Sequence, residues 1–321
     1  RRQVKRVLVI DGMNNFVRSY VVDPTLDANG NPIGGLSGFL KILQKNIREI
    51  RPDKIVICWE GPSGSVKRRS INKNYKAGRK PPRLNRQFDL TPIEEKENKI
   101  QQHVRLLDYL ELLPVTQLVI DGVEADDLIA WAVRAKYFDG WQKVILSNDK
   151  DFYQLCDDDT VIVRPVTKEI MNKARIIDDF NIHPDNFGLA RAIVGDTSDN
   201  IAGVAGVGLP TVAKRLPFLK EEKSFDVADV IKYCKENAGG VKAYTSIAEN
   251  ENVISENYEL MQLYIPSVST QGINKLHWAM ENTGNTLNKT KLRALLMKDG
   301  LGGLNLNEML VYLSRQSTEQ E

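Results

Sequence analysis

Residues 121–151, DGVEADDLIAWAVRAKYFDGWQKVILSNDKD, decide both the fold and the chemistry expected of this chain. Two apolar runs, TQLVI at 116–120 and KVIL at 143–146, read as buried strands. Acidic residues follow each run, and because the carboxyl ends of parallel strands meet at one edge of a sheet, these residues should lie together. They are Glu124, Asp126, Asp127, Asp149 and Asp151.

Carboxylates gathered in one place repel one another and raise each other's pKa unless a cation neutralises them. Oxygen ligands of this kind suit Mg²⁺ or Mn²⁺. The sequence therefore predicts a carboxylate-rich metal site at this edge of the sheet. Two simpler interpretations stay open. Asp126 and Asp127 favour a helix N-terminus by charge alone, and the pair of Asp149 and Asp151 is also typical of turns.

Strand-like runs and helical patterns alternate over the first part of the chain. The strand-like runs lie at 6–10, 54–59 and 160–165, and helical patterns lie between them at 34–51 and 91–113. This alternation predicts an α/β fold with a mostly parallel, doubly wound central sheet. Past about residue 180 we expect helices only, which divides the chain into a core at 1–180 and a helical region at 181–321.

Two more acidic residues directly follow predicted strands. Asp11 ends the run at 6–10, and Glu60 ends the run at 54–59. An acidic residue after the first strand of an α/β sheet points into the crevice where such folds bind ligands. Asp-Gly is also common turn chemistry, so the structural interpretation stays open for Asp11.

The helix predicted at 91–113 has a defined start and an expected buried face. Thr91-Pro92-Ile93-Glu94 is a capping box with proline at the first helical position. Its apolar stripe should face the core, and consists of Ile100, Val104, Leu107, Leu110 and Leu113.

Composition excludes several classes of protein. The chain has 321 residues, is 42% hydrophobic and 27% charged, and carries a net charge of +2, which indicates a folded protein without global basicity. Cys58, Cys156 and Cys234 are too few and too far apart for a disulfide framework or a zinc site, so a reducing compartment fits. No run approaches the ~20 apolar residues of a membrane span. No signal peptide precedes the first strand, and the missing initiator Met indicates a trimmed start, so we expect a cytoplasmic protein.

A basic segment at 67–86 contains no acidic residue. Its cations are Lys67, Arg68, Arg69, Lys73, Lys76, Arg79, Lys80, Arg83 and Arg86. The simplest interpretation is a solvated loop. Positive charge concentrated beside an acidic site in a near-neutral protein instead favours guiding a polyanion past that site. Tyr75 lies within the segment and could stack on an unpaired base.

A glycine-rich loop lies in DTSDNIAGVAGVGLPTVAKRL at 196–216, before a predicted helix. Gly203, Gly206 and Gly208 allow a backbone to approach a phosphate, and Lys214 and Arg215 add charge one turn further on. This pattern is typical of helix–hairpin–helix binding to a duplex backbone, although glycines are also ordinary turn residues. Asp196 and Asp199 precede the loop at a spacing that could present both to one cation.

Together, Asp11-Gly12 after a strand, EADD at 124–127, SNDKD at 147–151 and GDTSDNIAGVAGVG at 195–208 resemble the 5′ nuclease superfamily, in the same order. This superfamily contains flap endonucleases, the 5′-nuclease domains of bacterial DNA polymerase I and phage 5′→3′ exonucleases of the RNase H type. The resemblance covers most of residues 5–240, and the chain is most similar to the phage branch. It implies a PIN-like core, a basic helical arch at about 62–92 and a helix–three-turn–helix at 187–218.

The resemblance also implies roles for residues. Two divalent ions, Mg²⁺ with Mn²⁺ as a substitute, would be held by Asp11, Glu60, Glu124, Asp126, Asp127, Asp149, Asp151, Asp196 and Asp199. Glu60 departs from the family, which usually has aspartate there. Lys76 and Arg79 would contact the scissile phosphate, and K⁺ could hold the glycine loop. Nucleic acid would be bound by Arg18, Lys67, Arg68, Arg69, Lys73, Tyr75, Lys80, Arg83, Gly203, Gly206, Gly208, Lys214 and Arg215.

The implied activity is structure-specific cleavage of branched or 5′-ended DNA, and of RNA primers in RNA–DNA hybrids, during replication. We expect a monomer in the bacterial or phage-infected cytoplasm, with partners such as a single-strand-binding protein and no membrane contact. His103, His183 and His277 lie in no motif, so no Ser–His or Cys–His pair competes with metal chemistry. The alternatives are a PIN-like metal-dependent ribonuclease and a non-catalytic, structure-specific DNA-binding protein.

Overall fold

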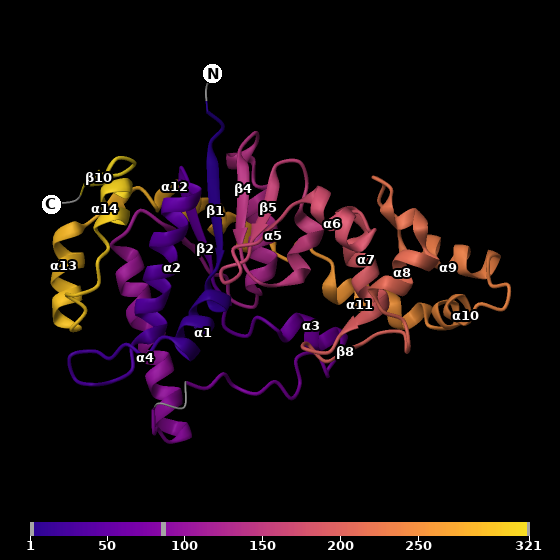
Figure 1. The fold of residues 1–321 in the computed structure, drawn as a ribbon, viewed down its shortest axis with the longest axis horizontal. Coiled ribbons are helices and arrows are strands. Elements are labelled where there is room, and N and C mark those ends of the chain that lie inside the picture. The colour runs from indigo at the N-terminus through magenta and orange to yellow at the C-terminus, as the bar shows by residue number, and fades with distance from the viewer. Residues whose placement is uncertain (1–2, 85–87, 320–321) are drawn as a thin grey trace.

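The computed structural model describes residues 3–84 and 88–319, and its centre is a six-stranded sheet (Figure 1). The strand order is β3-β2-β1-β4-β5-β6, and every pairing is parallel except that of β5 with β6. The strands are Arg6–Asp11 (β1), Lys54–Cys58 (β2), Thr116–Leu118 (β3), Gln142–Leu146 (β4), Thr160–Val163 (β5) and Ile170–Met171 (β6). The predicted α/β fold with a mostly parallel sheet is therefore confirmed.

The central strands are buried on both faces, as their continuous apolar runs predict. In β1, Val7 and Val9 pack into one hydrophobic cluster, whereas Leu8 and Ile10 pack into the other. The third strand is shorter than predicted, because β3 ends at Leu118 and the next side chain, Val119, is 51% exposed. β3 is an edge strand that pairs only with β2, and the apolar run from which its length was predicted continues beyond the paired residues.

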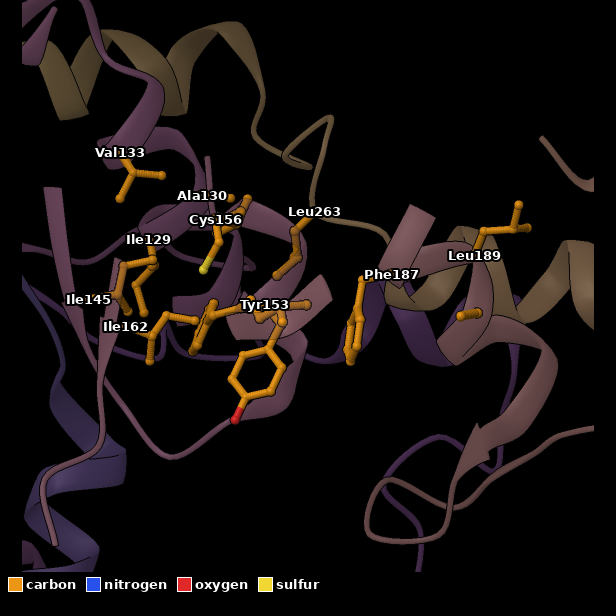
Figure 2. Packing of buried hydrophobic residues seen from close by; sticks show 14 of the residues in the cluster. Ile129, Ala130, Val133, Ile145, Tyr153, Cys156, Ile162, Phe187, Leu189 and Leu263 are labelled. Carbon is orange, nitrogen blue, oxygen red and sulfur yellow. The ribbon is translucent and has the colours of Figure 1, made fainter. Parts of the chain in front are cut away.

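Helices cover both faces of the sheet. One face carries Gly12–Val22 (α1), Gly34–Ile50 (α2) and Pro92–Glu111 (α4), which pack with Leu8 and Ile10. The other carries Ala125–Arg134 (α5), the 3₁₀ helices Lys136–Phe138 (η1) and Lys150–Leu155 (η2), and part of the helical region. Figure 2 shows how Ile129 of α5 and Ile145 of β4 lie together in this second layer.

The helix α4 begins as predicted, and the predicted burial of Leu110 and Leu113 is confirmed. The capping box between Thr91 and Glu94 is present. The prediction that Ile100 and Val104 are buried was wrong, since each is 53% exposed. The helix instead buries Gln102, whose Oε1 accepts the Gly35 N–H at 2.7 Å. A polar side chain with a hydrogen-bond partner can lie in the core, and apolar periodicity does not detect this.

The helical region lies to one side of the sheet and then returns to it (Figure 1). On the side lie Lys173–Phe180 (α6), Pro184–Val194 (α7), Leu209–Arg215 (α8), Pro217–Lys220 (η3), Val227–Glu236 (α9), Lys242–Glu249 (α10) and Glu251–Met261 (α11). The returning helices are Thr270–Asn282 (α12), Lys289–Lys298 (α13) and Asn307–Ser314 (α14). Leu292 and Leu310 of these helices join the cluster that contains Leu8. The boundary predicted near residue 180 stays a prediction.

The prediction that strands stop near residue 180 was wrong. Gly195–Asp196 (β7) pairs with Ile201–Ala202 (β8), and Thr286–Leu287 (β9) pairs with Thr318–Glu319 (β10). Pairs of two residues are too short to show the alternation by which strands are identified.

The three cysteines and His103 pack among other side chains of the protein. Cys58, Cys156 and Cys234 are buried free thiols. The His103 ring packs against the rings of Phe16 and Trp59. In the part of the chain that the structure describes, no helix combines the length and the apolar character needed to cross a bilayer.

Candidate metal and nucleic-acid site

Four neighbouring strands deliver acidic residues to one edge of the sheet. Asp11 ends β1 and caps α1, where its Oδ1 accepts the Asn14 N–H at 3.4 Å. Glu60 follows β2, Glu124 is the residue directly before α5, and the Asp149 side chain caps η2. Because the order β3-β2-β1-β4 places these strand ends side by side, the acidic residues converge as predicted.

Two groups of three carboxylates are close enough to share a metal ion. Oxygens of Asp126, Asp149 and Asp151 lie within 4.8 Å of one another, and so do oxygens of Asp151, Asp196 and Asp199. We call these the first and the second triad, and Asp151 belongs to both. The second triad forms because β7 and β8 fold residues 195–202 back against η2.

Two members of the first triad, Asp126 and Asp149, are half-buried carboxyl groups without an ion-pair partner among the described residues. Desolvation raises the pKa of Asp126 and Asp149 well above the usual range, and the nearby carboxylates add to this effect, Asp149 for Asp126 and Asp151 for Asp149. Over residues 3–84 and 88–319, neither forms an ion pair with lysine or arginine. Burial also raises the pKa of Asp11 to about 6, against hydrogen bonds from Asn14 and Ser147. A divalent cation would relieve these costs, so the residues fit a metal site.

Arg191 is a site residue that the sequence analysis missed. Its Nη2 donates to Asp151 Oδ1 and to Asp196 Oδ2, both at 3.1 Å, and its side chain is 14% exposed. The second triad therefore already contains a protein cation. A lone arginine in the last turn of the apolar helix α7, just before Asp196, was the available signal.

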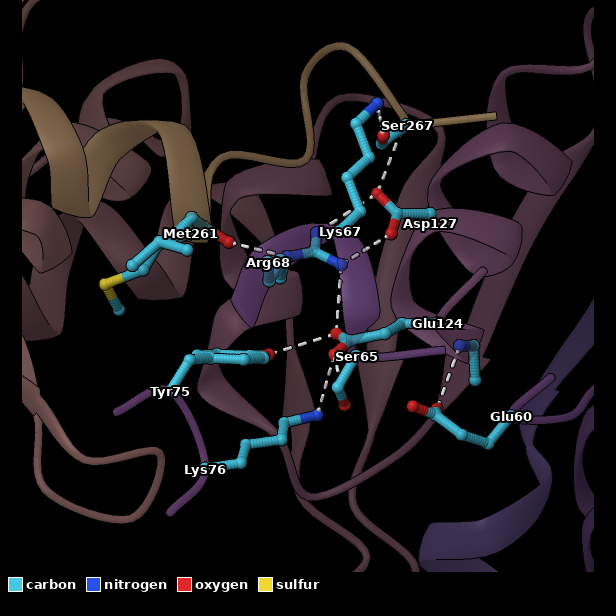
Figure 3. A network of polar contacts seen from close by, with 12 residues as sticks. Glu60, Ser65, Lys67, Arg68, Tyr75, Lys76, Glu124, Asp127, Met261 and Ser267 are labelled. Atoms are coloured by element: carbon cyan, nitrogen blue, oxygen red, sulfur yellow. Dashed lines mark hydrogen bonds and ion pairs between the residues drawn. The ribbon is translucent and has the colours of Figure 1, made fainter. Parts of the chain in front are cut away.

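Glu124 lies in a dense polar network and not in either triad (Figure 3). It is 1% exposed. Its carboxylate accepts from Arg68 Nη1 at 2.9 Å, the Tyr75 hydroxyl at 3.0 Å, Ser65 Oγ at 3.1 Å and Lys76 Nζ at 3.2 Å. Three of these four donors belong to the basic segment and the fourth, Ser65, lies just before it, so Glu124 anchors that segment to the sheet edge.

Two other predicted ligands also have partners within the protein. Asp127 accepts from Arg68 Nη1 at 2.7 Å and from the Ser267 N–H at 3.1 Å. Glu60 accepts the Ala125 N–H at 3.1 Å. The structure thus gathers Asp126, Asp149, Asp151, Asp196 and Asp199 into the triads, and leaves Asp11, Glu60, Glu124 and Asp127 outside them.

The basic segment is only briefly helical, so the expectation of a helical arch at 62–92 was wrong for its described residues. One helix, Val66–Ile71 (α3), is present, and turns follow it. Lys76 has a positive φ of 55°, and Pro81 and Pro82 follow, which together prevent a continuing helix. Residues 85–87, including Arg86, lie outside the described residues.

Lys76 and Arg79 both pair with acidic residues of the site. The Lys76 N–H donates to the Asp199 carbonyl at 2.8 Å, while its ammonium reaches Glu124. The Arg79 guanidinium pairs with the Asp199 carboxylate, and its Nε donates to the Ser198 carbonyl at 3.2 Å. Both cations therefore lie at acidic residues of the site, and their contact with a phosphate stays a prediction.

Two predicted nucleic-acid contacts are buried instead. The Tyr75 residue is 3% exposed and packs with Ile201, Leu260 and Met261, so in this structure its ring has no free face for a base. Arg68 is 8% exposed and bound to carboxylates. The sequence shows that Arg68 is charged and Tyr75 aromatic, but it does not show the residues that bury their side chains. The exposed predicted contacts are Lys67, Arg69, Lys73, Lys80 and Arg83, and Arg18 is half-buried on α1.

The glycine loop joins α7 to α8 through the β7–β8 pair. A Cβ on Gly203 would lie 2.1 Å from the Val194 carbonyl oxygen, so only glycine fits there. Gly206 has a φ of +76° and open space around it, and Gly208 is the N-cap of α8. Lys214 and Arg215 lie in the last turn of α8. Two helices flank the loop, whereas its assignment as a helix–three-turn–helix stays a prediction.

Comparison with known proteins shows the family of the chain. Residues 6–181 match the family described as 5′-3′ exonuclease, N-terminal resolvase-like domain. A 5′-3′ exonuclease from Aquifex aeolicus is 31% identical over 209 residues, which cover 65% of this chain and 68% of that protein. The thermostable DNA polymerase I of Thermus aquaticus is 30% identical over 212 residues. This chain spans only 24% of that polymerase.

Solved structures from bacteriophage T5 share the fold. The T5 5′-exonuclease with bound zinc ions gives a TM-score of 0.68 at 18% identity, covering 88% of this chain and 100% of that one. The T5 flap endonuclease, solved as a pseudo-enzyme–product complex with DNA and metal ions, gives 0.63 at 17% identity, covering 97% and 100%. At these identities the likeness shows the fold alone.

Proposed function

The chain belongs to the 5′-3′ exonuclease family, and from this premise we propose that it is a structure-specific, metal-dependent 5′ nuclease that hydrolyses phosphodiester bonds in branched or 5′-ended DNA. The observation that carries the proposal is the pair of carboxylate triads that share Asp151, with Lys76 and Arg79 beside them. The T5 flap endonuclease, which has this fold, binds DNA and metal ions and supports the same assignment.

Each triad would hold one divalent cation. Mg²⁺ suits these oxygen ligands, and Mn²⁺ should replace it. Ions bound there would lower the pKa of a bound water and neutralise charge that develops at the phosphate. Of the other predicted ligands, Asp11, Glu60 and Glu124 would act through bound water, which Mg²⁺ retains readily. Asp127 would not, because both of its carboxylate oxygens are bonded to Arg68.

The protein's own cations would bind and orient the phosphate. Lys76 and Arg79 pair with Glu124 and Asp199, and from these positions they would contact the scissile phosphate. Arg191 would hold the carboxylates of Asp151 and Asp196 in position, because it bridges them from a largely buried site. These roles require charge placed before the reaction, which is how such groups stabilise a transition state most effectively.

The loop at 203–208 would hold the duplex. Its open backbone at Gly206 and the exposed Lys214 suit phosphate oxygens, which carry no sequence information. K⁺ at this loop, RNA–DNA hybrids as substrates and a single-strand-binding protein as partner belong to the same proposal. So do a monomeric state and a cytoplasmic site of action in a bacterium or a phage-infected bacterium.

Cleavage of end-labelled substrates tests the proposed function. The panel contains flap, nicked, gapped and RNA-primed duplexes, each with Mg²⁺, with Mn²⁺ and with EDTA. We expect metal-dependent products from the flap and from 5′ ends. Duplex binding without metal-dependent cleavage would identify a non-catalytic DNA-binding protein, and cleavage of single-stranded RNA alone would identify a PIN-like ribonuclease.

A further inference from the structure

Arg68 is fully engaged inside the protein, although it belongs to the basic segment (Figure 3). Its Nη1 donates to Glu124 Oε2 at 2.9 Å and to Asp127 Oδ2 at 2.7 Å, and its Nη2 donates to Asp127 Oδ1 at 3.2 Å. Its Nε donates to the Leu260 carbonyl at 2.8 Å. Every nitrogen of the guanidinium therefore has a protein acceptor.

These bonds join three elements around the site. Arg68 lies on α3, its two carboxylate partners lie at the start of α5, and Leu260 lies at the end of α11. The two bonds to Asp127 use the planar fork of the guanidinium, a geometry that lysine cannot reproduce.

Glu124 connects Arg68 to Lys76, because its carboxylate accepts hydrogen bonds from both side chains. Ser65 at the start of α3 and Lys76 after its end both bond to Glu124 Oε1, while Arg68 holds Oε2. Both ends of the segment 65–76 are therefore hydrogen-bonded to the same carboxylate, that of Glu124. Without Arg68, Glu124 and Asp127, which are 1% and 2% exposed, would lose a buried cation and rearrange.

We propose that Arg68 is a positioning residue for the reaction and not a contact to DNA. By fixing Glu124 and Asp127 it holds Lys76 where the scissile phosphate will lie. This inference rests on the proposed nuclease function, because Lys76 matters only if a phosphate is cut there.

A cavity beside Arg68 makes the inference testable by chemical rescue. It has a volume of ≈ 320 Å³ and is lined by Arg68, Glu124, Asp127, Lys67 and Ser267, among others. Free guanidinium can therefore enter the space that Arg68→Ala would leave. Urea has nearly the same shape without the charge and serves as the control solute.

The experiment compares Arg68→Ala with Arg69→Ala, whose side chain is exposed on the same helix. For Arg68→Ala we expect a loss of about 100-fold in single-turnover cleavage at saturating flap DNA, the size typical of a misplaced catalytic group. Its Kd for flap DNA, measured with Ca²⁺, and its salt dependence should stay near wild type. Arg69→Ala should show the reverse, with weaker binding and a salt slope smaller by about one.

Guanidinium, but not urea, should restore cleavage by Arg68→Ala at matched ionic strength. Amide hydrogen exchange at residues 65–76 should quicken in Arg68→Ala and slow again with guanidinium, a readout that needs no cleavage. Unchanged exchange, an unchanged single-turnover rate, or a loss confined to affinity and its salt slope would each overturn the proposal.

Asp127→Asn is the second variant if Arg68→Ala does not fold. We expect the same loss of rate, with no further loss when both changes are combined, and additive losses would contradict a shared role. If the wild-type protein cleaves no substrate, the nuclease function fails. Hydrogen exchange would then still decide whether Arg68 holds the segment.

Discussion

Replacing Asp11 by asparagine should stabilise the metal-free protein above neutral pH. Burial raises the pKa of Asp11 from 3.8 to about 6, so the folded state holds this proton more tightly than the unfolded chain does. The stability that the proton contributes is present below the unfolded pKa of 3.8 and is lost as the pH rises through about 6. At pH 8 the buried charge thus costs the wild type up to about 3 kcal/mol, a penalty that asparagine avoids.

Part of this gain is offset by hydrogen bonding. The Asp11 carboxylate accepts from Ser147 Oγ at 3.1 Å and from the Asn14 N–H at 3.4 Å, and asparagine has one acceptor oxygen. Losing one such bond costs about 1 kcal/mol, which leaves a net gain of about 2 kcal/mol at pH 8. At about 2 °C per kcal/mol for a protein of this size, we expect the thermal midpoint to rise by roughly 4 °C.

The assay is thermal denaturation in EDTA from pH 4.5 to pH 8, for the wild type and for Asp11→Asn. The difference between the two proteins should be small at pH 4.5 and largest at pH 8. The exposed Asp121, replaced by asparagine, is the control and should show no such trend. A midpoint that falls at pH 8, or a difference that does not change with pH, would refute the reasoning.

Three further predictions concern the site. Asp149→Asn should lower cleavage by several orders of magnitude at saturating Mg²⁺ while duplex binding survives, and wild-type rates would remove Asp149 from the metal site. Arg79→Ala should reduce the single-turnover rate far more than affinity, whereas Arg83→Ala should affect mainly binding and its salt slope; equal and modest losses of affinity in both would indicate a generic basic loop. Gly206→Ala should weaken binding to unrelated duplexes alike, by up to about tenfold, because alanine strains a φ of +76°; a loss that depends on base sequence, measured by fluorescence anisotropy, would contradict a backbone contact.

The sequence predicted the sheet and the convergence of acidic residues because both follow from local patterns. Continuous apolar runs identify β1, β2 and β4, and the rule that parallel strands end at one edge then brings Asp126, Asp149 and Asp151 together. These inferences need no knowledge of which side chain contacts which.

The features that the sequence did not reveal depend on pairs of residues far apart in the chain. The burial of Arg68 depends on Glu124 and Asp127, and that of Tyr75 depends on Leu260, well over a hundred residues later. A run of cations looks the same in the sequence whether its members are solvated or bound to buried carboxylates.

Because α13 and α14 pack on the same side of the sheet as α1, α2 and α4, the folding of this chain depends strongly on contacts between distant segments. Leu292 and Leu310 pack into the same cluster as Leu8, so β1 completes its hydrophobic surroundings only with residues that come far later in the sequence. Contacts between residues far apart in the chain slow folding, because a long loop must close before they form. While the chain emerges from the ribosome, the apolar faces of α2 and α4 stay incompletely covered. A nascent chain that stops before α13 would expose that surface to aggregation and to chaperones.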